Sequence, residues 1–313
     1  MLLLHLQEVD EKRYAAQLKE LLGNYRVVTN SDDFKPEDIR YIAVWKPKDN
    51  AFNGLSNLKA VLSLGAGVDA LLAHPNLPSN TPIVRFVDRE LTQCMSDYII
   101  SNVYMHQRAF TRYNADQNAK KWAQFYPPPA WEISVGIMGL GILGIDAATR
   151  LMGLGFNVRG WSHSPKSIND LTSFAGNAQF DDFLAGTDIL VNLLPLTDET
   201  RGILNYKTFS KLRHDHLKDG PALVNAARGA HQIEEDIVKA LGDGTLGAAS
   251  LDVFNVEPLP TSSPLWELKN CYVTPHIAAI SNPDTGAKYF AKVISDHENG
   301  QPLINVINPE IGY

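Results

Sequence analysis

Three polar side chains in the second half of the chain, Arg228, Glu257 and His276, are of types that can act together on a carbonyl compound. A guanidinium offers planar, two-pronged donors that suit a carboxylate or a carbonyl oxygen. An imidazole can supply a proton near neutral pH, as is needed when hydride reduces a ketone to an alkoxide. A carboxylate paired with the other ring nitrogen would fix the ring. We therefore interpret these residues as a candidate catalytic set, although each alone is more often structural or solvated.

A glycine-rich segment supplies a second chemical signal. Gly139-Leu140-Gly141-Ile142-Leu143-Gly144 follows the apolar segment Ile133–Met138 and begins a helical pattern. Between a strand and a helix, the first glycine permits a tight turn, the second lets the backbone approach a pyrophosphate, and the third lets helix and strand pack closely. The amides of the helix N-terminus face the anion. The context predicts a dinucleotide-binding domain, and the six residues are predicted to contact the cofactor.

The type of dinucleotide is indicated by the end of the next strand. Trp161 is followed by Ser162, His163, Ser164 and Lys166, about 20 residues beyond the glycine loop. A site for NAD usually places a carboxylate there to bind the ribose 2′-hydroxyl, and this segment has none. Hydroxyls, an imidazole and an ammonium suit a 2′-phosphate. We expect NADPH to be the preferred cofactor and NADH to be possible; the alternative is an ordinary polar turn without cofactor preference.

The elements that must position these residues read as two α/β domains. Short apolar segments that alternate with helical patterns predict parallel sheets built from βαβ units. The predicted strands are Leu2–Leu6, Tyr25–Thr29, Ile39–Trp45, Leu58–Leu64, Ile133–Met138, Phe156–Trp161, Ile189–Leu193, Ala222–Ala226 and Gly247–Asp252. Apolar spacing predicts one long helix over Thr92–Trp122 that crosses between the domains, and another over Pro283–Asn299.

These elements give a specific domain organisation. Residues 1–97, completed by 278–313, are expected to form a flavodoxin-like substrate-binding domain. Residues 98–277 are expected to form a Rossmann domain. The fold class is therefore α/β, with two doubly wound parallel-sheet domains around a cleft.

Composition excludes several other functions. The chain has 313 residues, a formal net charge of −7 and no run of Lys or Arg, so it has no electrostatic footprint for nucleic acid. It lacks an uninterrupted apolar stretch of about 18 residues, so no membrane span is expected. Cys94 and Cys271 are far apart, and His214-Asp215-His216 reads as a solvated loop, so we expect neither a disulfide nor a metal. A cytoplasmic enzyme of small-molecule chemistry is the leading interpretation.

The order of five motifs adds a family resemblance. These motifs are the glycine loop, Leu194-Pro195-Leu196-Thr197, Asn225-Ala226-Ala227-Arg228-Gly229, Asp252-Val253-Phe254-x-x-Glu257-Pro258, and Pro264-Leu265-Trp266 followed by Thr274-Pro275-His276. Together they resemble the D-isomer-specific 2-hydroxyacid dehydrogenases over nearly the whole chain. The resemblance implies that Arg228 binds substrate, that Glu257 supports His276, and that His276 is the acid-base residue.

The same resemblance assigns further cofactor contacts. Asp252 would face the nicotinamide carboxamide. The remaining contacts would come from Leu194, Pro195, Leu196, Ala226, Ala227, Arg228 and His276. Relatives that use NADP commonly carry Arg where His163 stands here.

The first domain resembles the glyoxylate/hydroxypyruvate reductase branch of the family, in residues that include the terminal Gly312-Tyr313. This resemblance implies that Trp45 and Met95 line the substrate site, and that the amides of Gly65, Ala66 and Gly67 bind the substrate carboxylate, as an anion-binding turn can. Arg228 and His276 would complete the site. A core aromatic at a strand end is the alternative for Trp45. The family also implies a homodimer and a short 2-oxo acid as substrate.

Two alternatives to that function stay open. The first is the same chemistry on a larger or phosphorylated 2-oxo acid, for which Arg85 and Arg89 could supply charge. The second is a dinucleotide-sensing binding protein of the same fold, which would recognise a partner and show negligible turnover.

Overall fold

A computed structural model describes residues 1–308, so the Gly312-Tyr313 pair of the family resemblance lies outside the described residues. The chain divides into two compact units. The first unit contains Met1–Leu91 and the segment that starts at Ile280, and the second contains Thr92–Ala279. The division falls after residues 91 and 279, where the sequence suggested 97 and 277.

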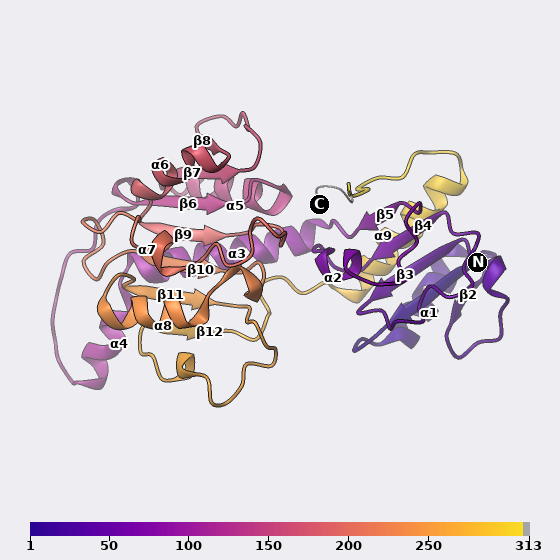
Figure 1. Cartoon of the computed structure of the whole chain (residues 1–313), viewed down its shortest axis with the longest axis horizontal. Helices are drawn as coiled ribbons and strands as arrows, with labels where there is room; N and C mark the ends of the chain where they lie inside the picture. Colours follow the sequence, from indigo (N-terminus) through magenta and orange to yellow (C-terminus); the bar gives the residue numbers. More distant parts are fainter. Residues whose placement is uncertain (309–313) are drawn as a thin grey trace. The chain divides into compact units, whose positions relative to one another are not determined.

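The first unit is built on a five-stranded sheet in which every neighbouring pair of strands is parallel (Figure 1). Its strands are β1 (Leu2–Leu6), β2 (Val27–Thr29), β3 (Tyr41–Trp45), β4 (Ala60–Ser63) and β5 (Ile83–Arg85). Its helical segments are α1 (Glu11–Leu22), the 3₁₀ turn η1 (Pro36–Asp38), α2 (Asp69–Leu72) and α9 (Pro283–Glu298). The strand order β2-β1-β3-β4-β5 is the flavodoxin-like order, which confirms the predicted fold of this unit.

Alternation along the strands gives this sheet an apolar core on each face. Leu2 and Leu4 join one core cluster, and Leu3 joins the other, because successive side chains of a strand point to opposite faces. Helix α1 and the distant α9 both contribute to the first cluster, for example through Tyr14 and Phe290. The C-terminal helix therefore completes the core that the N-terminal strands begin.

The second unit is built on a seven-stranded sheet of order β12-β11-β10-β9-β6-β7-β8, again with parallel neighbours. Its strands are β6 (Ser134–Met138), β7 (Asn157–Ser162), β8 (Thr172–Ala175), β9 (Ile189–Asn192), β10 (Ala222–Asn225), β11 (Ala248–Leu251) and β12 (Cys271–Val273). Counted with β6 as the first strand and read from β8 toward β12, the order is 3-2-1-4-5-6, and β12 is added as a seventh strand at the end. This order is that of a Rossmann fold and confirms the second predicted fold.

Helices cover both faces of the second sheet. Besides α3 (Arg89–Gln107), the helices of this unit are α4 (Phe110–Asn118), α5 (Ile142–Gly153), α6 (Phe180–Ala185), α7 (Tyr206–Phe209) and α8 (Glu234–Asp243). Its 3₁₀ turns are η2 (Ala130–Glu132), η3 (Asn177–Gln179), η4 (Gly229–His231) and η5 (Pro264–Trp266). Helix α3 contains the point at which the two units divide. Side chains of α3 and α5 pack in one core cluster, and side chains of α6 and α8 pack in the other.

The predicted single helix over Thr92–Trp122 is wrong. The structure has α3, then a break at Ala109 with a left-handed φ of 54°, then the shorter α4, which has no buried residue. The apolar stripe of α3 ends at the buried His106, whereas Phe110 is 54% exposed. Without an apolar face to bury, the pattern does not sustain a helix beyond Asn118.

Three short strands, β5, β8 and β12, were missing from the sequence prediction. Two of them, β8 and β12, form the edges of the second sheet, where strands are only partly buried and carry a weak apolar pattern.

Among residues 1–308, no helix combines the length and apolar character needed to cross a membrane. The same residues contain no group of three or more His, Cys, Asp or Glu placed to hold a metal ion. Both cysteines, Cys94 and Cys271, are free thiols.

Candidate active site

The glycine loop joins β6 to α5 in the second unit. Gly139 has a φ of 99°, and a Cβ there would lie 2.6 Å from the carbonyl oxygen of Leu193. A Cβ on Gly144 would lie 1.9 Å from the carbonyl oxygen of Gly139, so helix and loop meet too closely for a side chain. At Gly141, by contrast, a Cβ would meet nothing within 4 Å. The loop therefore leaves open space beside the first turn of α5, where backbone amides suit a pyrophosphate.

Trp161 at the end of β7 belongs to the core. Its ring is buried, and its Nε1–H donates to the carbonyl oxygen of Gly176 at 2.9 Å. The backbone oxygen of Trp161 accepts from the N–H of Gly139 at 2.9 Å. Trp161 thus ties the glycine loop to β7, and its ring packs against Phe180 instead of facing solvent.

The polar segment after β7 presents most of the expected groups to solvent. His163, Ser164 and Lys166 are exposed, whereas the buried Ser162 hydroxyl donates to the backbone oxygen of Ser164 at 2.8 Å. His163 Nδ1 lies 3.8 Å from Glu199 Oε2. The segment fits a phosphate through exposed donors, and the exposed Glu199 would compete with that phosphate for His163.

Asparagine side chains bind the backbone of the two loops, after β9 and β10, that carry predicted cofactor contacts. Leu194 N–H donates to Asn192 Oδ1 at 3.3 Å, and Ala227 N–H donates to Asn225 Oδ1 at 3.2 Å. Asn192 Nδ2–H in turn donates to Asn225 Oδ1 at 3.0 Å. The two loops therefore share one buried polar contact at the carboxyl edge of the sheet. Pro195, Leu196 and Ala226 lie in the same two loops, and Ala226 is buried.

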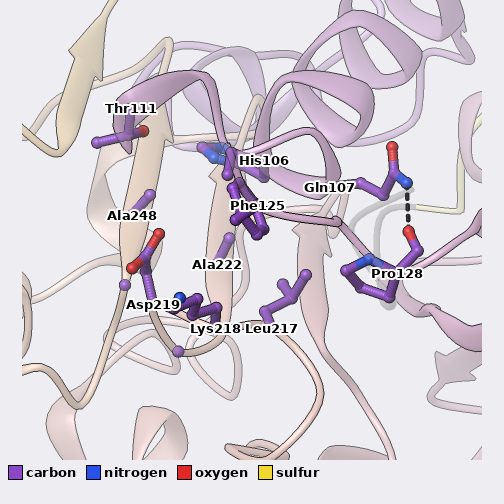
Figure 2. A pocket seen from close by; sticks show the side chains of 13 residues that line it. His106, Gln107, Thr111, Phe125, Pro128, Leu217, Lys218, Asp219, Ala222 and Ala248 are labelled. Carbon is purple, nitrogen blue, oxygen red and sulfur yellow. Dashed lines mark hydrogen bonds between the residues drawn. The ribbon is translucent and has the colours of Figure 1, made fainter. Parts of the chain in front are cut away.

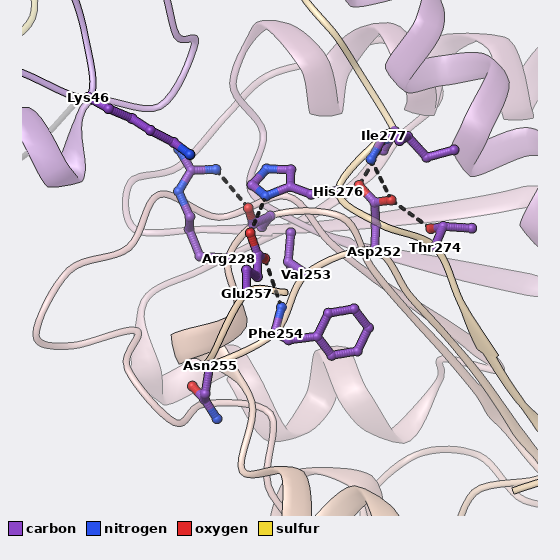
Figure 3. Close-up of polar contacts among 12 residues, drawn as sticks. Lys46, Arg228, Asp252, Val253, Phe254, Asn255, Glu257, Thr274, His276 and Ile277 are labelled. Carbon is purple, nitrogen blue, oxygen red and sulfur yellow. Dashed lines mark hydrogen bonds and ion pairs between the residues drawn. The ribbon is translucent and has the colours of Figure 1, made fainter. Parts of the chain in front are cut away.

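Glu257 and His276 form the central pair of the site (Figure 3). His276 Nδ1 lies 2.8 Å from Glu257 Oε2, and the other carboxylate oxygen accepts from the N–H of Phe254 at 3.0 Å. The carboxylate is thus fixed at both oxygens and accepts from the Nδ1–H tautomer. His276 has a left-handed φ of 55°, and both side chains are partly exposed. The ring therefore keeps Nε2 for a reacting group outside the pair.

Asp252 shapes the loop that carries His276. Its buried carboxylate accepts from Thr274 Oγ1–H at 2.6 Å, from Ile277 N–H at 2.9 Å and from Ala278 N–H at 2.9 Å. Its backbone oxygen accepts from His276 N–H at 2.8 Å. Figure 3 shows Thr274 and Ile277 beside the Asp252 carboxylate. Three donors stabilise a buried charge that would otherwise be costly, and they fix the backbone on both sides of His276.

Arg228 comes from the neighbouring strand end. It follows β10 in an extended conformation, is partly buried, and donates from Nη1 to the carbonyl oxygen of Ala227 at 2.8 Å. Because β10, β11 and β12 are adjacent and parallel, the segments that carry Arg228, Asp252 and His276 leave the sheet at one edge. The predicted catalytic residues of this unit therefore come from one row of strand ends.

Sequence reasoning missed the polar residues beneath that row. Asn225 Nδ2–H donates to Gln232 Oε1 at 2.9 Å, and Gln232 Nε2–H donates to the backbone oxygen of Val253 at 3.0 Å. All of these side-chain groups are buried. A sequence signal did exist: Asn192 and Asn225 each end an otherwise apolar strand. Such a network fixes the loops that carry the functional groups.

The first unit places its predicted residues at the carboxyl edge of its own sheet. The Trp45 ring lies so close to the turn after β4 that a Cβ on Gly65 would be 2.7 Å from ring atom Cζ3. Gly65 is buried, Ala66 is half-buried and Gly67 is exposed. Within residues 1–308, no backbone carbonyl accepts a hydrogen bond from the N–H of Gly65, Ala66 or Gly67. The turn thus offers amides to an anion next to an aromatic wall.

Met95 is placed differently. It lies on α3, is 7% exposed and packs in the core cluster with Ile99 and Val103. Its contribution to a substrate site stays a prediction.

A small cavity lies away from these residues, near the end of α3 (Figure 2). Its volume of about 30 Å³ has room for one or two water molecules and is too small for a dinucleotide or a substrate. His106 Nε2 lies 2.9 Å from Ser250 Oγ, whereas its Nδ1 is buried without a partner among the described residues. Burial lowers the pKa of the His106 imidazole to about 4. This cavity is a feature of the core and not the active site.

Comparisons with known proteins agree with this geometry. A family model described as the NAD binding domain of D-isomer specific 2-hydroxyacid dehydrogenases matches residues 100–278. A glyoxylate/hydroxypyruvate reductase A from Serratia proteamaculans is 42% identical over 286 residues, which cover 90% of this chain and 89% of the relative.

Two solved structures extend over the whole chain. A probable 2-hydroxyacid dehydrogenase from Rhizobium etli, in complex with NADP, HEPES and L(+)-tartaric acid, is 42% identical with a TM-score of 0.93. An NADPH-dependent glyoxylate/hydroxypyruvate reductase from Sinorhizobium meliloti, in complex with NADP and sulfate, is 40% identical with a TM-score of 0.92. Each match covers 100% of this chain and 99% of the other. The family model covers more than half of the chain, and the relatives match over nearly all of it, so the chain belongs to the D-isomer-specific 2-hydroxyacid dehydrogenase family.

Proposed function

We propose that the protein reduces short 2-oxo acids, glyoxylate to glycolate and hydroxypyruvate to D-glycerate, with NADPH as the preferred hydride donor. The observation that carries the proposal is the Glu257–His276 pair, with 2.8 Å between Oε2 and Nδ1, at the carboxyl edge of a sheet with an open glycine loop. The similarity to the Serratia proteamaculans and Sinorhizobium meliloti glyoxylate/hydroxypyruvate reductases supports the same substrates and, from the latter, NADPH.

His276 is the proton donor in this proposal. Glu257 accepts from Nδ1–H, which leaves Nε2 as the atom that gives its proton to the substrate carbonyl oxygen. Bound NADPH supplies the hydride that adds to the carbonyl carbon. The C=O double bond thereby becomes a C–O single bond with a new C–H and a new O–H bond, the cofactor is left as NADP⁺, and His276 is left neutral. Glu257 stabilises the imidazolium before the transfer and holds the ring in place throughout.

Arg228 binds the substrate carboxylate or carbonyl oxygen through its guanidinium, because planar paired donors match either group. In the first unit, the amides of Gly65, Ala66 and Gly67 bind the carboxylate, and the Trp45 ring lines the substrate site. Met95 is a further substrate contact in this proposal.

The dinucleotide is held by the glycine loop and the segment after β7. Gly139, Gly141 and Gly144 bring the backbone close to the pyrophosphate at the start of α5. His163 and Lys166 pair with the 2′-phosphate, with hydroxyls from Ser162 and Ser164. The remaining contacts are Leu140, Ile142, Leu143, Trp161, Leu194, Pro195, Leu196, Ala226, Ala227 and Asp252, with Asp252 toward the nicotinamide carboxamide.

We propose a cytoplasmic homodimer built on the second unit. Two side chains of the segment after α4, Trp122 and Tyr126, are 93% and 89% exposed, which supports a partner surface there. The domain boundaries near residues 97 and 277 belong to the same proposal. The free thiols of Cys94 and Cys271 support a reducing compartment.

The first experiment follows the absorbance of reduced nicotinamide with purified protein. NADPH and NADH are each tested with glyoxylate, hydroxypyruvate, pyruvate and phenylpyruvate. Faster oxidation of NADPH with the two small polar acids is the expected result. Preference for phenylpyruvate would move the function to a larger 2-oxo acid. NADPH binding without turnover of any substrate would contradict the enzyme and favour a dinucleotide sensor.

A further inference from the structure

The first sheet has a topological switch point at its carboxyl edge. The chain goes from β1 to β2 on one side and then continues with β3 on the other side of β1. Helix α1, which follows β1, packs in one core cluster, whereas Phe52 and Leu55 in the segment after β3 pack in the cluster on the opposite face. The connections after β1 and β3 therefore pass to opposite faces of the sheet. Open α/β sheets bind ligands at such points.

An ion pair occupies this switch point. Glu8 follows β1, Lys46 follows β3, and Lys46 Nζ bonds to Glu8 Oε2. Both side chains are mostly exposed, at 67% for Glu8 and 55% for Lys46. Both residues also have left-handed backbones, with φ of 57° and 47°. A left-handed residue other than glycine is strained, and such residues cluster at functional sites.

Neighbouring groups hold the Lys46 backbone in this conformation. On one side, Gln7 N–H donates to the backbone oxygen of Trp45 at 3.0 Å. On the other side, Lys48 N–H donates to the buried His5 ring at Nε2 at 3.1 Å, and Lys48 O lies 3.1 Å from His74 Nε2. The chain is therefore anchored immediately before and shortly after Lys46, so the backbone from which its side chain starts is held in place.

The same edge carries the residues that we assign to the substrate carboxylate. Trp45 directly precedes Lys46, and its ring packs on the Gly65 turn after β4, the strand next to β3. The ion pair therefore lies beside the wall of the proposed substrate site, on the side of β1. A 2-oxo acid whose carboxylate lies at the turn can extend its other substituent toward this pair.

We propose that the Glu8–Lys46 pair selects substrates by the charge of that substituent. While Glu8 holds Lys46, the ammonium is neutralised, so glyoxylate and hydroxypyruvate, whose substituents are uncharged, are favoured over 2-oxo acids with a second anionic group. This inference rests on the proposed function and bears on the alternative of a phosphorylated substrate. An acid with a second anion must take Lys46 from Glu8 and must also lie near the Glu8 carboxylate.

The test compares oxaloacetate, a 2-oxo acid with a second carboxylate, with hydroxypyruvate. Glu8→Gln removes one negative charge and frees Lys46, so the ratio of kcat/KM for oxaloacetate to that for hydroxypyruvate should rise about three- to tenfold. Lys46→Gln leaves Glu8 unpaired and should lower the same ratio by a similar factor. The changes should shrink as salt is raised, because the groups are exposed.

A matched control is the exposed pair Lys59–Glu298 of the same unit, with 2.8 Å between Nζ and Oε1. Lys59 precedes β4, so this pair lies at the opposite edge of the sheet. Glu298→Gln removes the same charge and should leave the ratio unchanged. Thermal unfolding of each variant checks that it is folded.

The outcomes separate the two proposals. If the wild type reduces glyoxylate and hydroxypyruvate but neither variant shifts the ratio, the ion-pair proposal is overturned and the function stands. An equal shift in Glu298→Gln would also overturn it, because the effect would then be one of net charge. A wild type without turnover overturns both proposals.

Discussion

The carboxyl edges of the two sheets are built in different ways. In the second unit, the functional carboxylates are fixed by several donors: Asp252 accepts three bonds, and Glu257 accepts one from a backbone amide and one from His276. In the first unit, the edge consists of a backbone turn, an aromatic ring and an exposed ion pair at strained residues.

This difference matches the two roles that we propose: proton transfer at the edge of the second unit and substrate selection at the edge of the first. Proton transfer needs groups held within a few tenths of an ångström, and buried hydrogen bonds provide that rigidity. Recognition of a substituent needs only a charge at a defined place, and an exposed pair can provide it at little cost to stability. We therefore expect substitutions at the edge of the second unit to change kcat strongly, and substitutions at the edge of the first unit to change ratios between substrates.

The largest expected effect is at His276 and Arg228, two of the predicted catalytic residues. His276→Ala or Arg228→Ala should lower kcat/KM for glyoxylate at least about a hundredfold at pH 7, because losing a transition-state charge partner costs about 2.7–4 kcal/mol. Steady-state oxidation of NADPH measures this loss. His214→Ala, which removes an exposed imidazole of the same unit, is the matched control. Activity near that of the wild type in either variant would refute the role of that residue and the comparison with it.

The second prediction concerns acid stability. Burial lowers the pKa of His106 to about 4 from 6.5, so the folded state holds the ring neutral where the unfolded chain would protonate it. Its contribution to stability is full above pH 6.5 and is lost as the pH falls toward 4. At about 1.4 kcal/mol per pKa unit, the loss reaches about 3 kcal/mol.

Hydrogen exchange between pH 7 and pH 4.5 measures this loss separately in each unit. The second unit should lose protection more steeply than the first. In His106→Gln the steep component should disappear, whereas His214→Gln should retain it. An unchanged pH dependence in His106→Gln would show that another group controls the acid stability of the second unit.

The third prediction concerns the dinucleotide. Ser162→Asp places a carboxylate at the end of β7, where it repels a 2′-phosphate and can accept from a ribose 2′-hydroxyl. The ratio of the NADPH to the NADH dissociation constant should rise at least about tenfold, measured by quenching of tryptophan fluorescence. Ser164→Ala, which removes a hydroxyl without adding charge, should change the ratio less. An unchanged ratio in Ser162→Asp would remove the basis for placing the 2′-phosphate there.

Both sheets could be predicted from the sequence because their strands are short, apolar and separated by helical patterns. The glycine loop could be predicted as well. A side chain at Gly139 or Gly144 would collide with the backbone, so the fold requires glycine at these positions and the sequence shows it there. The long helix over Thr92–Trp122 was wrong because periodicity alone does not reveal that Phe110 finds nothing to pack against.

The site was predicted less completely. The types and order of Arg228, Glu257 and His276 identified candidates, but the three donors to Asp252 come from 22 to 26 residues away and depend on the packing of β11 beside β12. The Glu8–Lys46 pair joins residues 38 positions apart, and the local sequence around neither residue predicts the contact. Contacts of this kind follow from the register of parallel strands, which a sequence pattern does not fix.

The smallest expected effect tests whether the edge of the first unit stores strain. At a left-handed position, alanine suffers the steric cost of its Cβ, about 1–2 kcal/mol, which glycine avoids. Lys46→Gly should therefore have a free energy of unfolding about 1 kcal/mol larger than Lys46→Ala, and since both lose the ion pair, the difference isolates the backbone. At Lys48, two residues along and also exposed, the order should reverse, because alanine restricts the unfolded chain more than glycine does. Urea unfolding of the four variants measures both differences. If Lys46→Ala were as stable as Lys46→Gly, or more stable, the Lys46 backbone would not be strained, and a fixed backbone could no longer be part of the reason for selection by charge.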